Sequence, residues 1–226
     1  MTLPVAVLVS GSGSNLQAII DRIEDGVLAA RITAVVSNKA EAYALARAQN
    51  HGLATALLPH AAFPDRSAYD AALLAAVRDS GAEAVVLAGF MRLLGADFVA
   101  AYRDRILNIH PALLPGFPGL AAQGQAAGYG VTIAGATVHF VDEKMDNGPI
   151  VIQAAVPALP DDDAQSLGGR IMTLEHRIYP QAIHWLATGR LSIHGRKTRL
   201  APADMPKADM ADAMPCLVSP ALEAGF

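Results

Sequence analysis

The chain has 226 residues and a formal net charge of −4 at pH 7; 53% of its residues are hydrophobic and 5% are aromatic. The acidic balance argues against a nucleic-acid partner or an anionic membrane surface. The one cysteine of the sequence, Cys216, excludes an intrachain disulfide and a thiolate metal cluster, so we expect a reducing, cytoplasmic setting. We also expect no metal, because the histidines are scattered and form no ligand pair.

Short apolar runs alternate with longer helical patterns over the first half of the chain. The runs are continuous rather than alternating, which is typical of parallel strands covered on both faces. Strands are predicted at 5–9, 32–36, 54–57, 84–87 and 106–109, with helices at 16–25, 43–51, 67–80 and 96–102. This order predicts an α/β fold with a Rossmann-like, doubly wound, mostly parallel sheet.

The pattern changes after Pro115. A Gly/Pro-rich loop at 116–119 is followed by strand-like runs at 136–141 and 150–156, and the turn signal Asp146-Asn147-Gly148 between these runs predicts an antiparallel hairpin. A long helix is predicted at 164–187, kinked near Pro180. We expect a single domain over 1–200 with halves at 1–105 and 106–200, and a poorly ordered tail at 201–226.

A loop of small residues, Ser10-Gly11-Ser12-Gly13-Ser14-Asn15, follows the first predicted strand. Such a loop frees backbone N–H groups and a helix amino terminus to bind an anion. The third glycine of a dinucleotide fingerprint is replaced by Leu16, and the second strand ends in Ser37-Asn38-Lys39 rather than in an acidic residue. A compact phosphate monoester is therefore favoured over NAD; the alternative is a plain turn with Ser14 or Asn15 as the helix N-cap.

Asn108 and His110 lie two residues apart at the end of a predicted strand, so their side chains share a face, and Pro111 ends the strand. A neutral amide donor beside an imidazole can stabilise a developing oxyanion. Asp146 is a candidate carboxylate that would keep His110 protonated, although a plain turn aspartate is the simpler interpretation. Activated nucleophiles and metal-binding histidine pairs are not evident in the sequence, which favours direct transfer to a bound nucleophile.

Several ordered segments between about Val5 and Arg190 carry a resemblance to a known family. They are SGSGSNLQAII at 10–20, VVSNKA at 35–40, VVLAGFMR at 85–92, NIHPALLP at 108–115, TVHFV at 137–141 and DNGPI at 146–150. The chain resembles the folate-dependent glycinamide ribonucleotide formyltransferases of purine biosynthesis. This resemblance implies a formyltransferase fold, and transfer of a formyl group from 10-formyltetrahydrofolate to the amine of glycinamide ribonucleotide.

The resemblance also implies roles for individual residues, with a folate-binding and catalytic second half and a phosphate-binding first half. The catalytic trio would be Asn108, His110 and Asp146. The substrate would contact Gly13, Ser14 and Asn15 through its phosphate and Met172 and Glu175 through its sugar. The folate would contact Arg66, Met91, Arg92, Leu93, Leu94, Val141, Asp142 and Glu143. Small-molecule partners and a monomer or homodimer are expected.

The chain departs from the family pattern at two places. Residues 121–125 are small, which predicts a more mobile loop over the substrate, and Met172 stands where many relatives have glutamine. Methionyl-tRNA formyltransferase and formyltetrahydrofolate deformylase share the Asn-x-His-Pro segment and remain alternatives, but the first usually adds a nucleic-acid-binding domain and the second a regulatory domain. A non-catalytic phosphosugar-binding module is the alternative from a different class.

Overall fold

The computed structural model describes residues 2–203 and 215–226, and these form two compact units. The first unit comprises the chain up to Asn108 together with Val141–Glu143. The second comprises Ile109–Phe140 and the chain from Lys144 onward. The division falls inside strand β5 (Ile106–His110), between Asn108 and Ile109.

A parallel sheet forms the centre of the first unit. Its strands lie in the order β3-β2-β1-β4-β5, and all of their pairings are parallel. Because the chain moves outward in both directions from β1, the carboxyl ends of β1 and β4 form a topological switch point, where α/β sheets commonly bind ligands. The strands preceding β5 are β1 (Leu3–Val9), β2 (Ala30–Ser37), β3 (Thr55–Leu57) and β4 (Ala84–Leu87).

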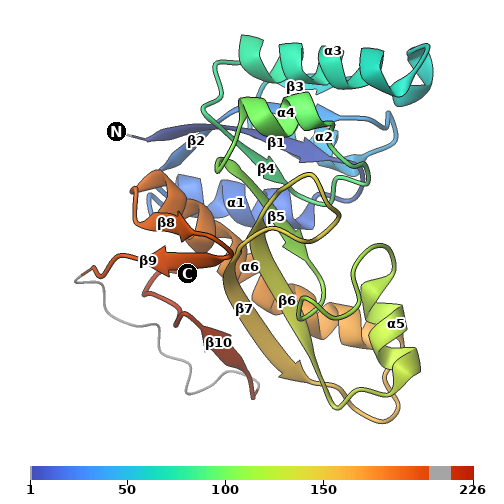
Figure 1. The fold of residues 1–226 in the computed structure, drawn as a ribbon, viewed down its shortest axis with the longest axis vertical. Helices are drawn as coiled ribbons and strands as arrows, with labels where there is room; N and C mark the ends of the chain where they lie inside the picture. Colours follow the sequence, from blue (N-terminus) through green and yellow to red (C-terminus); the bar gives the residue numbers. More distant parts are fainter. Residues whose placement is uncertain (1, 204–214) are drawn as a thin grey trace. The chain divides into compact units, whose positions relative to one another are not determined.

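Helices cover this sheet because both of its faces are apolar. On one face Leu8, Val36 and Leu87 pack in a buried cluster with Tyr69 and Phe98, and Figure 1 shows α3 and α4, which carry these aromatic rings, on the same side of the strands. Alternate strand residues on the opposite face are also buried, as a doubly wound sheet requires. The helices are α1 (Ser14–Glu24), α2 (Tyr43–Asn50), α3 (Arg66–Asp79) and α4 (Ala96–Ala101), with a short 3₁₀ turn η1 (His60–Ala62).

Antiparallel pairing dominates the second unit. β6 (Ile133–Phe140) pairs antiparallel with β7 (Ile150–Pro157), as the turn signal between them predicted. The helices of this unit are α5 (Ala122–Tyr129) and α6 (Ala164–Ala187). Asp163 caps α6 by accepting hydrogen bonds from the backbone of Gln165 and Ser166, which explains why the helix begins where the sequence predicted. The predicted α/β fold, with a parallel core and antiparallel strands in the carboxyl-terminal half, is confirmed.

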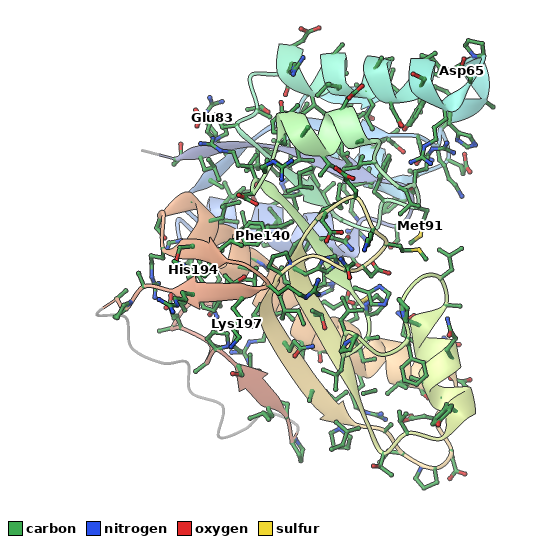
Figure 2. The ribbon with its side chains drawn as sticks, viewed as in Figure 1. Asp65, Glu83, Met91, Phe140, His194 and Lys197 are labelled. Carbon is green, nitrogen blue, oxygen red and sulfur yellow. The ribbon has the colours of Figure 1, made fainter. Side chains whose placement is uncertain are left out.

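A hairpin after α6 was not predicted. β8 (Leu191–His194) pairs antiparallel with β9 (Lys197–Leu200), and Figure 2 shows His194 and Lys197 on these neighbouring strands. Gly195 opens the two-residue turn with a φ of 62°, a conformation that hairpin turns require and that glycine adopts readily. The sequence signal for this hairpin was the Gly195-Arg196 pair, which follows a short run of alternating apolar and polar residues at 191–194.

The expectation of a mobile loop at 121–125 is not met, because most of this segment belongs to α5. Ala122 and Ala126 are one helical turn apart and both are buried, so alanines that looked merely small form the packed face of a short helix. No helix in the described part of the chain is both long and apolar enough to cross a membrane.

The prediction of a poorly ordered tail is wrong for residues 215–226. Strand β10 (Leu217–Ser219) pairs antiparallel with β7, and Leu222 and Phe226 are buried. Gln181 of α6 donates to the Ala221 carbonyl and accepts from the Glu223 N–H. These partners lie far away along the chain, so no local pattern could reveal them; the predicted tail residues 204–214 lie outside the described residues.

Candidate functional site

The predicted phosphate loop joins β1 to α1 in the first unit. Helix α1 begins at Ser14, and its N-cap is Gly13 in the left-handed conformation with a φ of 74°. The proposed side-chain caps Ser14 and Asn15 therefore stand inside the first turn rather than at the N-cap. A helix start without a side-chain cap presents backbone N–H groups and the positive end of the helix dipole, which together suit an anion.

Helix α2 packs closely behind this loop and dictates the glycine at position 13. A Cβ atom on Gly13 would lie 2.6 Å from Ala44 Cβ, and the positive φ is itself unfavourable for other residues. The Ala44 N–H also donates to the Gly11 carbonyl over 3.1 Å. The loop is therefore packed against α2 at Gly13 and hydrogen-bonded to it at Gly11.

Ser10 and Asn38 are buried residues of this edge whose roles the sequence did not reveal. The Ser10 hydroxyl donates to Asn38 Oδ1 over 2.5 Å and accepts from the Met91 N–H over 2.9 Å. One hydroxyl thus ties together the chain after β1, β2 and β4. Asn38, found where a dinucleotide site would carry an acidic residue, completes this hydrogen-bonded tie.

The residues predicted to hold folate in the first unit divide into exposed and buried groups. Met91 and Leu93 are 59% and 52% exposed, whereas Leu94 is 8% exposed and belongs to the core. Arg66 lies beside them: its guanidinium donates to the Leu93 carbonyl over 3.3 Å and pairs with Asp70 over 3.4 Å. The structure thus brings Arg66 and Leu93 together, whereas the Leu94 side chain packs in the hydrophobic core.

Arg92 packs differently from its neighbours. Its guanidinium carbon lies 5.0 Å from the centroid of the Tyr69 ring, within the range of a cation–π contact. Tyr69 is buried, and burial raises the pKa of its phenol to about 12, partly opposed by the charge of Arg92. Val141, the first of the predicted folate residues at 141–143, donates its N–H to the Ile106 carbonyl in the same unit. Asp142 and Glu143 follow it there.

Asn108 ends the described pairing of β5 with β4. Its partner in register is Leu87, and Asn108 is partly buried while Leu107 before it is fully buried. Both faces of β5 are covered, and Asn108 is its least buried residue, on the face opposite to Leu107.

His110 and Asp146 meet in the second unit. Asp146 Oδ2 lies 3.5 Å from His110 Nδ1, and the two side chains are only 12% and 6% exposed. On its other side, His110 Nε2 lies 2.8 Å from the Phe117 carbonyl oxygen. The two ring nitrogens therefore face oxygen atoms on opposite sides of the imidazole, a carboxylate oxygen at Nδ1 and a backbone carbonyl oxygen at Nε2.

The Asp146 carboxylate is oriented by the backbone around it. Its Oδ2 atom accepts a hydrogen bond from the Gly119 N–H over 2.8 Å, and the residue itself has a φ of 49°. A positive φ is uncommon for residues other than glycine and concentrates where the surrounding structure enforces it. Phe117 and Ala121 of the facing loop share this feature, with φ values of 50° and 56°.

Thr137 and Gln153 hold the chain that follows His110. They are paired across β6 and β7, and Thr137 Oγ1 donates to the Ala112 carbonyl and accepts from the Leu114 N–H. Gln153 Nε2 donates to the Leu114 carbonyl and to Thr137 Oγ1, each over 3.0 Å. These polar groups inside apolar strands lock the Pro111–Pro115 segment in place, and their position in otherwise apolar runs was the missed signal.

His139 is a second buried histidine beside Asp146. Its Nε2 atom lies 3.8 Å from Asp146 Oδ1, and its Nδ1 atom lies 2.7 Å from the Phe140 carbonyl oxygen. Asp146 is thus flanked by two imidazole rings, of which the sequence had singled out only His110.

The predicted sugar-binding residues lie on α6. Met172 and Glu175 are three residues apart, so they share a face of the helix. Glu175 is 8% exposed and Met172 is 40% exposed, which places a buried carboxylate beside a partly open thioether. Among the described residues, no group of three or more His, Cys, Asp or Glu side chains could hold a metal ion.

Comparisons with known proteins find relatives that match most of this chain. The chain is 46% identical over 190 residues to phosphoribosylglycinamide formyltransferase of Escherichia coli, a match covering 84% of this chain and 90% of the relative. It is 47% identical to the trifunctional purine biosynthetic protein adenosine-3 of Drosophila pseudoobscura, of which it spans only 15%.

Solved structures show the same likeness. The crystal structure of glycinamide ribonucleotide transformylase 1 from Symbiobacterium toebii superposes with a TM-score of 0.88 at 49% sequence identity, covering 89% of this chain and 95% of that one. The formyl transferase family matches residues 3–183, which is most of the chain. The chain is therefore an enzyme of the formyl transferase family.

Proposed function

We propose that this enzyme transfers the formyl group of 10-formyltetrahydrofolate to the amine of glycinamide ribonucleotide. The products are formylglycinamide ribonucleotide and tetrahydrofolate, as in de novo purine biosynthesis. The observation that carries the proposal is the buried contact between His110 and Asp146 in a chain whose relatives bear the name of this activity. The folate acts as a co-substrate, and the mechanism uses no metal.

The chemistry begins with the amine of glycinamide ribonucleotide. An α-amino group has a pKa of roughly 8, so at neutral pH it must lose a proton before or during attack. Its nitrogen then forms a bond to the formyl carbon, and the carbonyl electrons move to oxygen, giving a tetrahedral oxyanion. Cleavage of the bond between this carbon and the folate nitrogen, which takes up a proton, completes the transfer.

Asn108 and His110 are the proposed donors to that oxyanion. A well-placed donor of this kind contributes about 3 kcal/mol to transition-state stabilisation. In the ligand-free protein one His110 nitrogen already donates to the Phe117 carbonyl, so this bond must exchange for one to the substrate. Asp146 keeps the imidazole charged and accepts the proton of the attacking amine, directly or through water.

The remaining residues are proposed to bind and orient the two substrates. Gly13, Ser14 and Asn15 bind the phosphate, and Glu175, with Met172 beside it, binds the sugar hydroxyls. Arg66, Met91–Leu94 and Val141–Glu143 contact the folate. We place the reaction in the cytoplasm, with small molecules as the only partners and a monomer or homodimer as the working assembly.

A direct assay tests the proposal. Purified enzyme is incubated with 10-formyltetrahydrofolate and glycinamide ribonucleotide, and release of tetrahydrofolate is followed by absorbance while the formylated product is identified by mass spectrometry. Turnover that requires glycinamide ribonucleotide is the expected result. Turnover only with methionyl-tRNA, or hydrolysis of the donor without any acceptor, would instead assign the alternative activities.

A further inference from the structure

Arg47 of α2 contacts the predicted phosphate loop and the helix that follows it. Its Nε atom donates to the Ser12 carbonyl over 2.9 Å, and its Nη1 atom donates to Gln17 Oε1 on α1 over 3.2 Å. Its guanidinium carbon lies 4.9 Å from the centroid of the Tyr43 ring. Three contacts in different directions therefore fix the guanidinium group of a partly buried side chain.

The carbonyl groups of two successive peptide units in this loop point toward α2. The Gly11 carbonyl accepts from the Ala44 N–H, and the Ser12 carbonyl accepts from Arg47. In a planar trans peptide the C=O and the following N–H point in opposite directions. The N–H groups of Ser12 and Gly13 are consequently turned away from α2.

We propose that Arg47 is a positioning residue for phosphate binding, acting through the Ser12 carbonyl to aim the Gly13 N–H at the phosphate. This inference rests on the proposed function, because it deepens the role of the same loop. Position 13 is glycine with a positive φ, so the Ser12–Gly13 peptide could rotate easily without an anchor on its carbonyl. A guanidinium is suited to this anchoring because its rigid fork serves two acceptors at once.

Steady-state kinetics with two variants test the proposal. Arg47→Met removes both donors, and Arg47→Lys keeps the positive charge but cannot reproduce the fork. We expect both variants to raise KM for glycinamide ribonucleotide about tenfold, which corresponds to loss of about 1.4 kcal/mol of binding free energy. The kcat value and the KM for the folate donor should change less than twofold. Arg22→Met, which removes an arginine paired with Asp25 on α1, is the matched control.

The nucleoside lacking the phosphate separates positioning from a general structural role. Its KM should be the same for wild type and both Arg47 variants, because there is no phosphate for the loop to hold. An equal rise in KM for the phosphorylated and dephosphorylated substrates would overturn the proposal in favour of a structural effect. Full recovery in Arg47→Lys would overturn it in favour of charge attraction alone.

Inorganic phosphate provides a readout independent of turnover. Backbone amide NMR signals of Ser12 and Gly13 should shift on phosphate titration of the wild-type protein, and Arg47→Met should require about tenfold more phosphate for the same shift. Identical titration curves would refute the role of Arg47. The two proposals can fail separately. If Arg47→Met weakens phosphate binding but the wild-type enzyme does not formylate glycinamide ribonucleotide, the role of Arg47 stands and the proposed function is refuted.

Discussion

The Asp146 carboxylate lies 3.5 Å from His110 Nδ1, and both side chains are nearly excluded from solvent. The second nitrogen of His110 faces the Phe117 carbonyl oxygen at 2.8 Å. Asp146 is itself oriented by the Gly119 N–H. This chain of contacts joins the end of β5, the loop after it and the turn between β6 and β7 within one unit, and it holds the His110 ring between two oxygen atoms.

Replacing His110 by alanine should lower kcat about 100-fold while changing both KM values little, because a donor to the oxyanion acts mainly in the transition state. His194→Ala is a suitable control, since His194 is exposed on β8. Steady-state kinetics with each substrate varied in turn provide the measurement. A large rise in KM with a nearly normal kcat would contradict the assigned role.

Asp146→Asn should preserve the fold and still abolish most activity. The asparagine oxygen can accept from the Gly119 N–H, but the side chain no longer carries the negative charge that lies 3.5 Å from His110 Nδ1 and can accept no proton from the attacking amine. Asp104→Asn is the matched control, because Asp104 is an exposed aspartate that also has a positive φ, 59° against 49°. Kinetics are read beside thermal unfolding, and an active Asp146→Asn enzyme would remove the carboxylate from the mechanism.

Gly13→Ala should weaken the binding of glycinamide ribonucleotide, because the added methyl group would collide with α2 as well as strain the backbone at a positive φ. The added Cβ would lie 2.6 Å from Ala44 Cβ, so the loop must move away from α2. Gly26→Ala separates the two effects, because Gly26 has nearly the same φ, 75° against 74°, with no atom within 4 Å of its added Cβ. A KM for glycinamide ribonucleotide that rises only in Gly13→Ala is expected; similar KM values in both variants would argue against a close-packed phosphate loop.

Glu223→Gln should destabilise the protein by about 3 kcal/mol, because it breaks a buried ion pair and leaves the Arg190 guanidinium uncompensated. The two side chains are 10% and 13% exposed and meet at 2.8 Å. The control is Glu83→Gln, whose carboxylate lies 3.8 Å from Arg105 in a pair about 60% exposed. A surface pair of this kind contributes at most about 1 kcal/mol. Denaturant unfolding measures both changes, and equal values would show that the Arg190–Glu223 pair contributes no more to stability than an exposed ion pair.

Tyr69→Phe should reduce the loss of stability in alkaline solution. Burial raises the pKa of Tyr69 from its usual 10.0 to about 12, so between these pH values the unfolded chain releases a proton that the folded protein retains. The unfolded state then binds fewer protons, and the free energy of unfolding falls as pH rises. Among the described residues the hydroxyl has no hydrogen-bond partner, so the variant should differ by less than about 1 kcal/mol at pH 7.

Unfolding measured at about pH 7 and pH 11 tests this expectation. Tyr129→Phe is the control, because Tyr129 is 80% exposed and its phenol is hydrated in both states. A Tyr69→Phe protein with the same alkaline loss as the wild type would show that folding does not raise the pKa of Tyr69.

Much of the fold could be predicted because its signals are local. The runs that became β1 and β4 are continuously apolar, and the run predicted at 32–36 is interrupted only by Thr33. The turn Asp146-Asn147-Gly148 marks the β6–β7 hairpin. Failures occurred where stability depends on distant partners. Alanines 122 and 126 form a helix face only against their packing neighbours, and residues 215–226 are held by Gln181, Arg177 and Arg190 of the preceding helix and its end.

The sequence by itself determined the order of strands and helices up to β5, the β6–β7 hairpin, the glycine-rich loop, and the candidates Asn108, His110 and Asp146, because spacing along the chain reports periodicity, turns and residue chemistry. Only the tertiary structure decided that Asp146 reaches His110, that Phe117 occupies the other ring nitrogen, and that Arg47 holds the Ser12 carbonyl. The physical reason is that hydrogen bonds and ion pairs act over a few ångströms in space. The folded backbone brings together groups that are far apart in the sequence, and their separation in sequence does not predict their distance in space.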